Sequence, residues 1–387
     1  MAKFRIELKQ HTPLIHFQSE QPGAILRATE VKPKLDRFLI ECAFNNEFNE
    51  YKQYLIGYKA GKKEYDFKDK KAFDYKLRIT TDTKNIQEEN IEFFKYNKSQ
   101  AFPNYFGNMG KDKKNKDKKN KFVFCDVLNL EIFSLNKNLL VKIGEKLPLF
   151  LMKHNFGQRQ SKGFGSFFIN NENKYFINDD EQIYSPNEIN NVKKLRYSFD
   201  VDFNTNFIKK NINNQHIINK KDFYKEAFGV FNQIQSIYTR IRRGGQKFDP
   251  YIKKYVVEQN IIWDKDAIKE KYCDLRINNN NKRYLVKDLL GLSSTEVWVK
   301  SNKIITKEHE TIQRYQSPVF FKPLKVSKDK YIVYFEGREI SKEYLNKEFL
   351  VRCNGTGELK LNTPENFSIN EFLDYVEEND RYIRINE

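Results

Sequence analysis

Two segments of alternating polar and apolar residues, one at the start of the chain and one near its middle, constrain the fold most. In KFRIEL (3–8) every second residue is apolar, which predicts a strand with one buried face. KLRYSFDVDF (194–203) repeats this pattern and opens the second half of the chain. Each half then passes through a helical segment and returns to strands. The sequence therefore predicts an α+β fold built from two similar units.

The remaining segments support this plan. Apolar residues at helical spacing predict helices over 137–157, despite Pro148, and over 221–243, where Gly244 and Gly245 follow. A closing helix is expected to begin at the N-cap residue Ser368. Pro33 argues against a continuous helix over 21–44, where a loop and then a short helix or extended segment are expected. Further strands are expected at 76–81, 122–135, 165–169, 317–326, 329–337 and 349–353.

The length of the chain sets the number of domains. A chain of 387 residues exceeds one ordinary core and fits two domains of about 150–200 residues each. We predict a first domain at 1–193, with a lysine-rich insertion at about 108–121, and a second domain at 194–387 with a helical insertion.

The charge of the chain indicates the class of partner. The formal net charge is +17, from 69 Lys+Arg and 52 Asp+Glu, which favours polyanions. The run KDKKNKDKKNK (111–121) holds seven lysines and two aspartates, so it accounts for only part of the excess. A Lys- and Asn-rich composition of the kind that an AT-rich genome produces is a second contribution.

Several classes of protein are disfavoured. Cys42, Cys125, Cys273 and Cys353 lie far apart without a CxxC pair, so neither a zinc site nor a disulfide framework is expected, as in a reducing compartment. The N-terminal segment lacks the apolar core of a signal peptide, and no stretch approaches the roughly 20 apolar residues of a membrane span. We expect a cytoplasmic protein with no membrane partner, no metal and no cofactor.

A glycine-rich stretch, NFGQRQSKGFGSFFI (155–169), follows the first predicted long helix. It does not fit GxxxxGK[ST], because Gly157 and Gly163 are one residue too far apart and Lys162 precedes the second glycine. It does not fit a dinucleotide-binding GxGxxG either, because the order here is helix, loop and strand. We call residues 155–166 the glycine loop.

Two interpretations of the glycine loop remain. Its glycines would let backbone N–H groups approach an anionic backbone closely, with charge from Arg159 and Lys162. Phe164 would then stack on a base or pack beneath the loop. Alternatively, the loop is an ordinary turn between a helix and a strand, with incidental basic residues.

The stretch GQRQSKGFGSFFI resembles the glycine-rich signature of the RAMP superfamily of CRISPR-associated proteins. ELKQHTPLIHF (7–17) is similar to the opening strand and TPL loop of that superfamily, and the position of the loop in mid-chain resembles the large two-domain RAMP subunit of type III-B effector complexes. The arginine- and tryptophan-rich helix start of many such subunits is absent, and ILRATEVKPKLDRFL (25–39) stands in its place. The matching positions are Gly157, Arg159, Lys162, Gly163, Phe164, Gly165 and Ser166.

This resemblance implies two tandem ferredoxin-like (RRM-like) domains with helical and loop insertions. It also implies a non-catalytic RNA-binding subunit of a type III effector complex, which contacts guide RNA and neighbouring subunits and helps capture target RNA. Base pairing with the guide would then supply the sequence specificity.

Basic residues elsewhere extend the expected RNA surface. One group lies near the start, where a solvated surface is the alternative, and another ends the helix of 221–243, where cations also suit the helix dipole. SPVFFKPL is similar to a RAMP strand of the form SPxxFK, which would place Lys322 on an RNA-facing sheet; a plain structural strand is the alternative. The residues predicted to bind RNA are Gly157, Arg159, Gln160, Lys162, Gly163, Phe164, Gly165, Arg27, Lys32, Lys34, Arg240, Arg242, Arg243 and Lys322.

An enzymatic alternative stays open. Some RAMP proteins process guide RNA precursors without a metal, with histidine as general acid or base, and His11, His16 and His154 are the candidates here. Asp36 lies in a basic segment but lacks the flanks of the target-cutting loop of the superfamily. We predict no catalytic residue; the alternatives are a metal-independent endoribonuclease and an unrelated basic RNA-binding protein.

Overall fold

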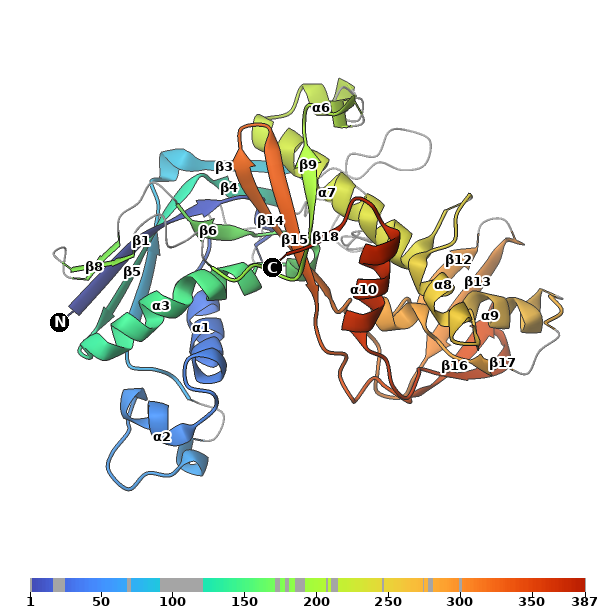
Figure 1. The fold of residues 1–387 in the computed structure, drawn as a ribbon, viewed down its shortest axis with the longest axis horizontal. Coiled ribbons are helices and arrows are strands. Elements are labelled where there is room, and N and C mark those ends of the chain that lie inside the picture. The colour runs from blue at the N-terminus through green and yellow to red at the C-terminus, as the bar shows by residue number, and fades with distance from the viewer. Residues whose placement is uncertain are drawn as a thin grey trace.

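The computed structural model describes residues 2–16, 25–67, 71–90, 121–170, 175–177, 181–184, 192–206, 208–209, 215–245, 247–273, 275–277, 281–298 and 301–386. Helices and mostly antiparallel sheets alternate along these residues, as Figure 1 shows. This arrangement confirms the predicted α+β class. The predicted lysine-rich insertion lies outside the described residues up to residue 120, and Lys121 begins the strand β4 (Lys121–Cys125).

The first half of the chain folds around one sheet. Its elements are β1 (Ala2–Gln10), α1 (Ala28–Cys42), β2 (Lys76–Thr80), β5 (Val127–Ser134), α3 (Lys137–Lys153), β6 (Phe167–Ile169), β7 (Tyr175–Ile177) and β8 (Glu181–Tyr184). β1 is central: it pairs antiparallel with β5 on one side and with β6 and β7 on the other. β2 lies beyond β5, and β8 beyond β7.

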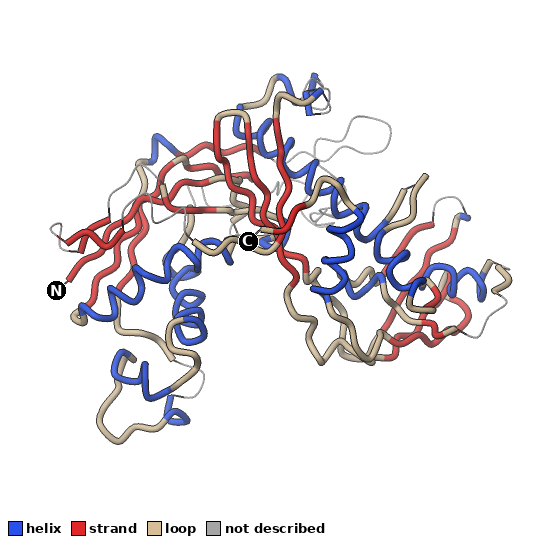
Figure 2. Tube along the Cα trace, in the orientation of Figure 1, coloured by secondary structure: helices blue, strands red, loops and turns tan. Residues whose placement is uncertain are grey.

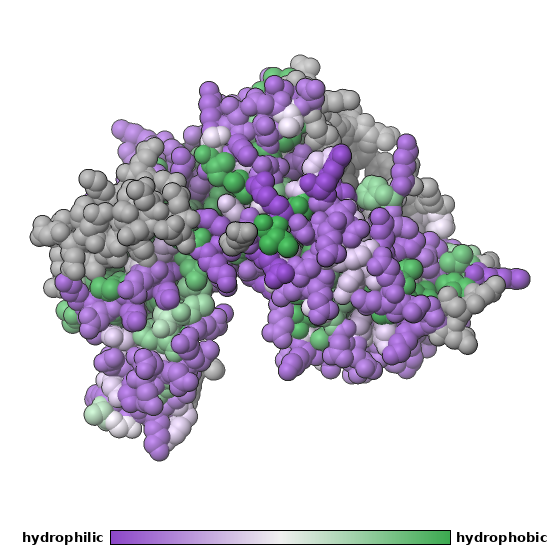
Figure 3. All heavy atoms as spheres, in the orientation of Figure 1, coloured by the Kyte–Doolittle hydropathy of each residue, from purple (hydrophilic) through white to green (hydrophobic). Residues whose placement is uncertain are grey.

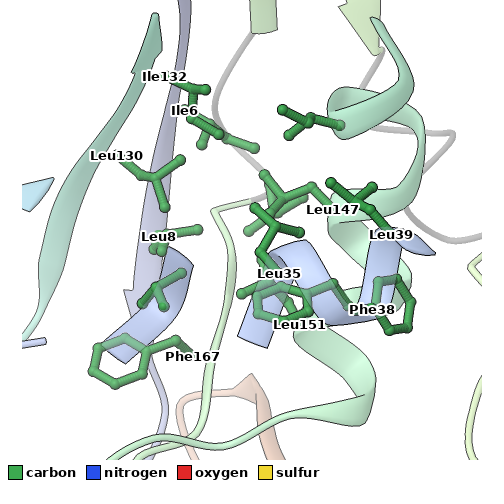
Figure 4. Packing of buried hydrophobic residues seen from close by; sticks show 14 of the residues in the cluster. Ile6, Leu8, Leu35, Phe38, Leu39, Leu130, Ile132, Leu147, Leu151 and Phe167 are labelled. Atoms are coloured by element: carbon green, nitrogen blue, oxygen red, sulfur yellow. The ribbon is translucent and has the colours of Figure 1, made fainter. Parts of the chain in front are cut away.

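Buried and more exposed residues alternate along β1 and β5, and the buried ones form part of the core of the first half. Ile6 pairs with Leu130, and both side chains are buried on the same face of the sheet. Figure 4 shows Leu35 of α1 and Leu147 of α3 among the side chains that pack beside these strands. The two helices therefore cover one face of the sheet, as the period-2 pattern requires.

The prediction that Pro33 prevents a continuous helix is wrong. α1 runs without a break through Pro33, and its buried side chains include Leu35, Phe38 and Leu39. A proline inside a helix costs about 3 kcal/mol, whereas burial of one large apolar side chain stabilises by about 1.5–3 kcal/mol. Burial of three such side chains therefore offsets the proline. α3 likewise continues through Pro148.

The second half contains a sheet in the order β14-β15-β9-β18, in which all neighbours are antiparallel. Its elements follow the chain as β9 (Tyr197–Asp202), α7 (Asp222–Tyr238), β14 (Val319–Ser327), β15 (Lys330–Gly337), α10 (Ile369–Asn379) and β18 (Arg384–Ile385). The predicted N-cap of the closing helix is confirmed, because the Ser368 hydroxyl accepts a hydrogen bond from the Glu371 N–H at 3.2 Å.

A third sheet is built from two separate insertions in the second half. β12 (Thr295–Trp298) and β13 (Lys303–Glu308) come between α7 and β14, whereas β16 (Glu348–Cys353) and β17 (Thr356–Asn362) come between β15 and α10. β13 pairs with β16 and joins the two insertions. Figure 2 shows these strands at one end of the molecule, apart from the sheets that contain β1 and β9. The insertion thus contains strands as well as the predicted helices.

Shorter elements complete the described fold. They are α2 (Phe48–Tyr51), β3 (Ile86–Asn90), α6 (Gln215–Ile218), α8 (Tyr251–Glu258), β10 (Ile261–Ile262), α9 (Asp264–Tyr272), β11 (Lys282–Arg283), the π-helical turn η6 (Thr239–Arg243) and the 3-10 turns η1 (Lys52–Tyr54), η2 (Glu64–Phe67), η3 (Thr83–Asn85), η5 (Gln160–Lys162) and η7 (Lys287–Leu290).

The two halves share apolar contacts. Phe164 of the glycine loop is buried among residues of the second half, and its ring stacks on Phe231 of α7 with 4.0 Å between centroids. In the other direction, Phe320 and Leu324 of β14 belong to the core of the first half. The glycine loop therefore lies at the junction of the halves.

Candidate nucleic-acid interface

Three glycines of the glycine loop adopt backbone conformations that other residues avoid. Their φ angles are +75° at Gly157, +87° at Gly163 and +63° at Gly165. A Cβ at Gly165 would lie 2.0 Å from the Phe156 carbonyl oxygen, and one at Gly157 would lie 2.6 Å from the Ile15 carbonyl oxygen. The glycines are therefore required for close approach of the chain to itself.

The N–H groups of these glycines donate to protein acceptors. Gly157 donates to Glu30 Oε1 at 2.8 Å, Gly165 to the Pro13 carbonyl at 2.9 Å, and Gly163 to the Gln160 carbonyl at 3.1 Å. The three N–H groups already have protein acceptors, which corrects the prediction that Gly157, Gly163 and Gly165 present amides to RNA. Their role in this structure is to shape the loop.

The opening TPL segment holds the loop from one side. The Thr12 hydroxyl donates to the Gly163 carbonyl at 2.6 Å and accepts from the Ser166 N–H at 3.0 Å. The Gln158 N–H donates to the Ile15 carbonyl at 2.8 Å. The similarity of both segments to one superfamily therefore has a physical basis, since the two segments bind each other.

Two of the predicted RNA-binding side chains are enclosed by protein. Phe164 is fully buried, so it packs beneath the loop and cannot stack on a base in this structure. Lys322 is also fully buried, and its amino group donates to the carbonyls of His154 and Phe167, each at 2.9 Å, and to Asn155 Oδ1 at 3.3 Å. The prediction that Lys322 lies on an RNA-facing sheet is wrong, because the first half covers that face of β14.

Helix α1 holds the loop from the other side. Lys34 donates to Glu30 and to Gln160 Oε1, each at 2.9 Å, so Gln160 spans from the loop to α1. Lys32 instead donates to Asp36 at 2.9 Å, and its amino group lies 3.9 Å from the Tyr75 ring centroid. Lys32 and Lys34 thus have structural contacts.

Sequence reasoning missed two residues that position the loop. Glu30 accepts from the loop at Gly157, and Asn155 donates to the carbonyls of Gln160 and Phe321, each at 2.8 Å. The spacing of Glu30 and Lys34 by four residues was a usable signal for an ion pair on a helix. Asn155 gave no such signal, since its partner Phe321 is 166 residues away.

The basic residues at the end of α7 differ in exposure. Arg240 pairs with the buried Asp380 at 2.7 Å. Arg242 lies against the turn η7, donates to Ser293 Oγ at 3.0 Å and is 3.6 Å from Asp288 Oδ1. Arg243 is exposed at the end of the π-helical turn, and Arg27 is half-buried at the N-cap of α1. Arg243 is therefore the most accessible cation of this group.

The loop and the end of α7 come together in what we call the cation cluster: Arg159, Lys162 and Arg242. Burial, together with the positive charges of Arg159 and Arg242, lowers the pKa of Lys162 to about 7. Three cations that repel one another in a partly desolvated place are stabilised by a bound anion. The structure thus brings together basic residues that are distant in sequence. Figure 3 shows hydrophilic residues over most of the face in view.

Of the candidate catalytic histidines, His11 and His16 are buried and His154 is partly buried. Burial, together with the charges of Lys322 and neighbouring lysines, lowers the pKa of His11 to about 3, and burial lowers the pKa of His154 to about 4. His16 is 3% exposed. Within the described ranges, no group of three or more histidine, cysteine or acidic residues is arranged to hold a metal ion. Among the described helices, none has the length and apolar character to cross a membrane.

Two family models match nearly the whole chain: the Cmr1 N-terminal domain over residues 1–245 and the Cmr1 C-terminal domain over residues 247–387. Cmr1 from Pyrococcus furiosus, solved in an apo form, is 11% identical, with coverage of 100% of this chain and 98% of that chain and a TM-score of 0.43. A chain of type III-B Cmr-beta bound to cognate target RNA is 12% identical, with coverage of 47% and 61% and a TM-score of 0.28. No curated protein matches the chain.

Proposed function

This chain belongs to the Cmr1 family, and on that premise we propose that it is a non-catalytic RNA-binding subunit of a type III CRISPR effector complex. Its partners are guide RNA, target RNA and the neighbouring subunits. The observation that carries the proposal is the cation cluster, because it joins Arg159 and Lys162 of the first half to Arg242 of the second. A strand of RNA phosphates crossing the junction would neutralise this charge.

We also propose that both halves are ferredoxin-like, RRM-like domains, divided near residues 193 and 194. The support is the connectivity that the two halves share once the elements inserted between them are set aside: strand, helix, two strands, helix, strand, which is β1-α1-β2-β5-α3-β6 in the first half and β9-α7-β14-β15-α10-β18 in the second. The sheet orders agree as well, since β6-β1-β5-β2 in the first half matches β18-β9-β15-β14 in the second. Proteins with this fold commonly bind single-stranded RNA. The junction between two such domains is then a natural path for a strand.

Among the predicted residues, Arg159, Lys162, Arg243 and Arg27 are those we propose to contact phosphates directly. Gln160, Lys34, Lys32, Arg240 and Arg242 would position these residues or add positive charge to the surface. The burial of His11 and His16 supports a non-catalytic role, because a general acid or base must reach the proton that it transfers.

Replacement of Arg159 and Lys162 together by alanine is expected to weaken binding of a 20-nucleotide single-stranded RNA. The slope of log K against log salt is negative, and each lost phosphate contact makes it shallower by about 0.7. The slope of the double variant should therefore be shallower by about 1.4. Fluorescence anisotropy over a salt series measures this slope. The melting temperature should change little, because both side chains are partly exposed and their removal relieves the repulsion within the cation cluster.

The matched control removes two exposed lysines after α2, with Lys59→Ala and Lys63→Ala. The control has the same formal net charge as the Arg159 and Lys162 variant. If its slope becomes equally shallow, only the overall charge matters, and the proposed surface is contradicted. The RNA from each titration is also run on a denaturing gel in EDTA and in magnesium. Cleavage at one position would contradict the non-catalytic part of the proposal.

The affinity for RNA should fall as the pH rises above 7. The free protein has a Lys162 pKa of about 7, whereas a phosphate beside the amino group favours its charged form and raises that pKa. Binding therefore takes up a proton above pH 7, and affinity falls by at most about tenfold per pH unit. Anisotropy titrations from pH 6 to pH 9 measure the profile. Lys162→Arg stays charged and should flatten it; identical profiles for both proteins would contradict the assignment.

A further inference from the structure

A pocket of about 330 Å³ lies along the C-terminal part of α7 and the turn η6 that follows it. It is lined by Asn232, Gln235, Ser236, Thr239, Arg240 and Phe248. Ligand pockets usually span about 300–1,000 Å³. This one therefore has room for a single small ring system rather than for a large cofactor.

The backbone around the pocket presents an aromatic ring at its edge. α7 ends in the π-helical turn η6, where the Gly244 N–H donates to the Thr239 carbonyl at 2.8 Å. The Gly245 N–H then donates to the Phe248 carbonyl at 2.9 Å, and a Cβ at Gly245 would lie 2.6 Å from the Phe248 ring. Phe248 is thus held by its own backbone while its side chain remains 45% exposed. Single π-helical turns occur frequently at functional sites.

Apart from Arg240 and Phe248, the lining residues are polar and uncharged. Two carboxamides and two hydroxyls line the pocket, and such groups can both donate and accept. Arg240 is held by the buried Asp380 at 2.7 Å, so it is fixed in place. Arg243 and Lys247 are exposed nearby in the sequence. An aromatic face and amide edges form the combination that recognises an unstacked base.

We propose that this pocket binds one unstacked base of single-stranded RNA, with the base stacked on Phe248 and its edge hydrogen-bonded to Asn232 and Gln235. The inference rests on the proposed RNA-binding function and adds a base site to the phosphate-binding surface. Thr239 of the pocket and Arg242 of the cation cluster lie three residues apart in the same π-helical turn, η6. A strand can therefore pass its phosphates over the cluster and turn one base into the pocket.

Phe248→Leu tests the stacking, because it keeps an apolar side chain and removes the aromatic face. With the full chain and a 12-nucleotide oligouridine, the dissociation constant should rise by about 5- to 150-fold, the equivalent of one stacked base. The salt slope should not change, because no cation is lost. Tyr65→Leu is the matched control, since Tyr65 is 71% exposed near α2, and it should bind like the natural chain.

Phe248→Trp gives an independent readout. Its fluorescence should be quenched by oligouridine and unaffected by inorganic polyphosphate, which has charge but no base. The base pocket would be overturned if Phe248→Leu and Tyr65→Leu bound RNA equally well, or if RNA did not quench the tryptophan fluorescence. The phosphate surface would still be supported in that case by weaker binding of the Arg159 and Lys162 variant. Absence of any RNA binding by the natural chain at low salt would overturn the proposed function and the pocket together.

Discussion

Gly165→Ala is expected to lower the melting temperature by roughly 10–15 °C, the largest effect of any single change that we consider. An L-residue in the left-handed region costs about 1–2 kcal/mol, and the new Cβ would also overlap the Phe156 carbonyl at 2.0 Å. That carbonyl belongs to a buried residue whose own N–H donates to the Gly165 carbonyl at 3.0 Å, so it cannot move away without breaking the loop. A total of about 4 kcal/mol or more corresponds to the expected shift.

Gly61→Ala is the matched control for this experiment. Gly61 has a φ of +91°, and no atom lies within 4 Å of the position that its Cβ would take. Only the conformational cost applies there, so its melting temperature should fall by a few degrees at most. Thermal unfolding followed by circular dichroism compares the two variants. Similar small shifts would show that the glycine loop can relax and that its glycines are not required for packing.

Lys322→Met is expected to destabilise the protein by about 3 kcal/mol, which corresponds to roughly 6–12 °C in melting temperature. The natural amino group donates three hydrogen bonds to the His154, Phe167 and Asn155 oxygens of the first half. Methionine has a similar shape but no donor, so these buried oxygens each lose a partner. Because the bonds join the two halves, the variant should also be cut faster by protease at the junction.

Lys325→Met, three residues further along the same strand, provides the comparison. Its amino group pairs with Glu226 at 2.6 Å, and both side chains are about one quarter exposed. A pair of this kind contributes up to about 1 kcal/mol, so urea unfolding should show a small change. Equal destabilisation by the two substitutions would contradict a special role for the buried lysine.

The sequence allowed prediction of features that depend on local pattern. The alternation in KFRIEL and KLRYSFDVDF predicted β1 and β9, and the apolar spacing of 221–243 predicted α7; the structure confirms all three. The family models likewise confirm the resemblance to the large two-domain RAMP subunit. These signals lie within short windows, where the period of apolar residues determines the element.

Features that depend on distant partners were less accessible. The glycine loop was compatible both with amides facing RNA and with an ordinary turn, because the acceptor for Gly157, Glu30, lies 127 residues away. Lys322 was misplaced for the same reason, since the sequence does not show which element covers β14. One signal was present: Lys322 interrupts an otherwise apolar run, VFFKPL (319–324), and such runs indicate a strand buried on both faces.

The sheet that contains β9 has a consequence for how such a chain can evolve. Its strands β14, β15 and β18 lie after the boundary of the family models at residues 245 and 247, whereas β9 lies before it. A cut at that boundary would separate β9 from β15 and leave a strand edge open to unwanted pairing. The two segments that the family models match therefore cannot be exchanged separately between relatives. Recombination would preserve the fold only if both segments were inherited together.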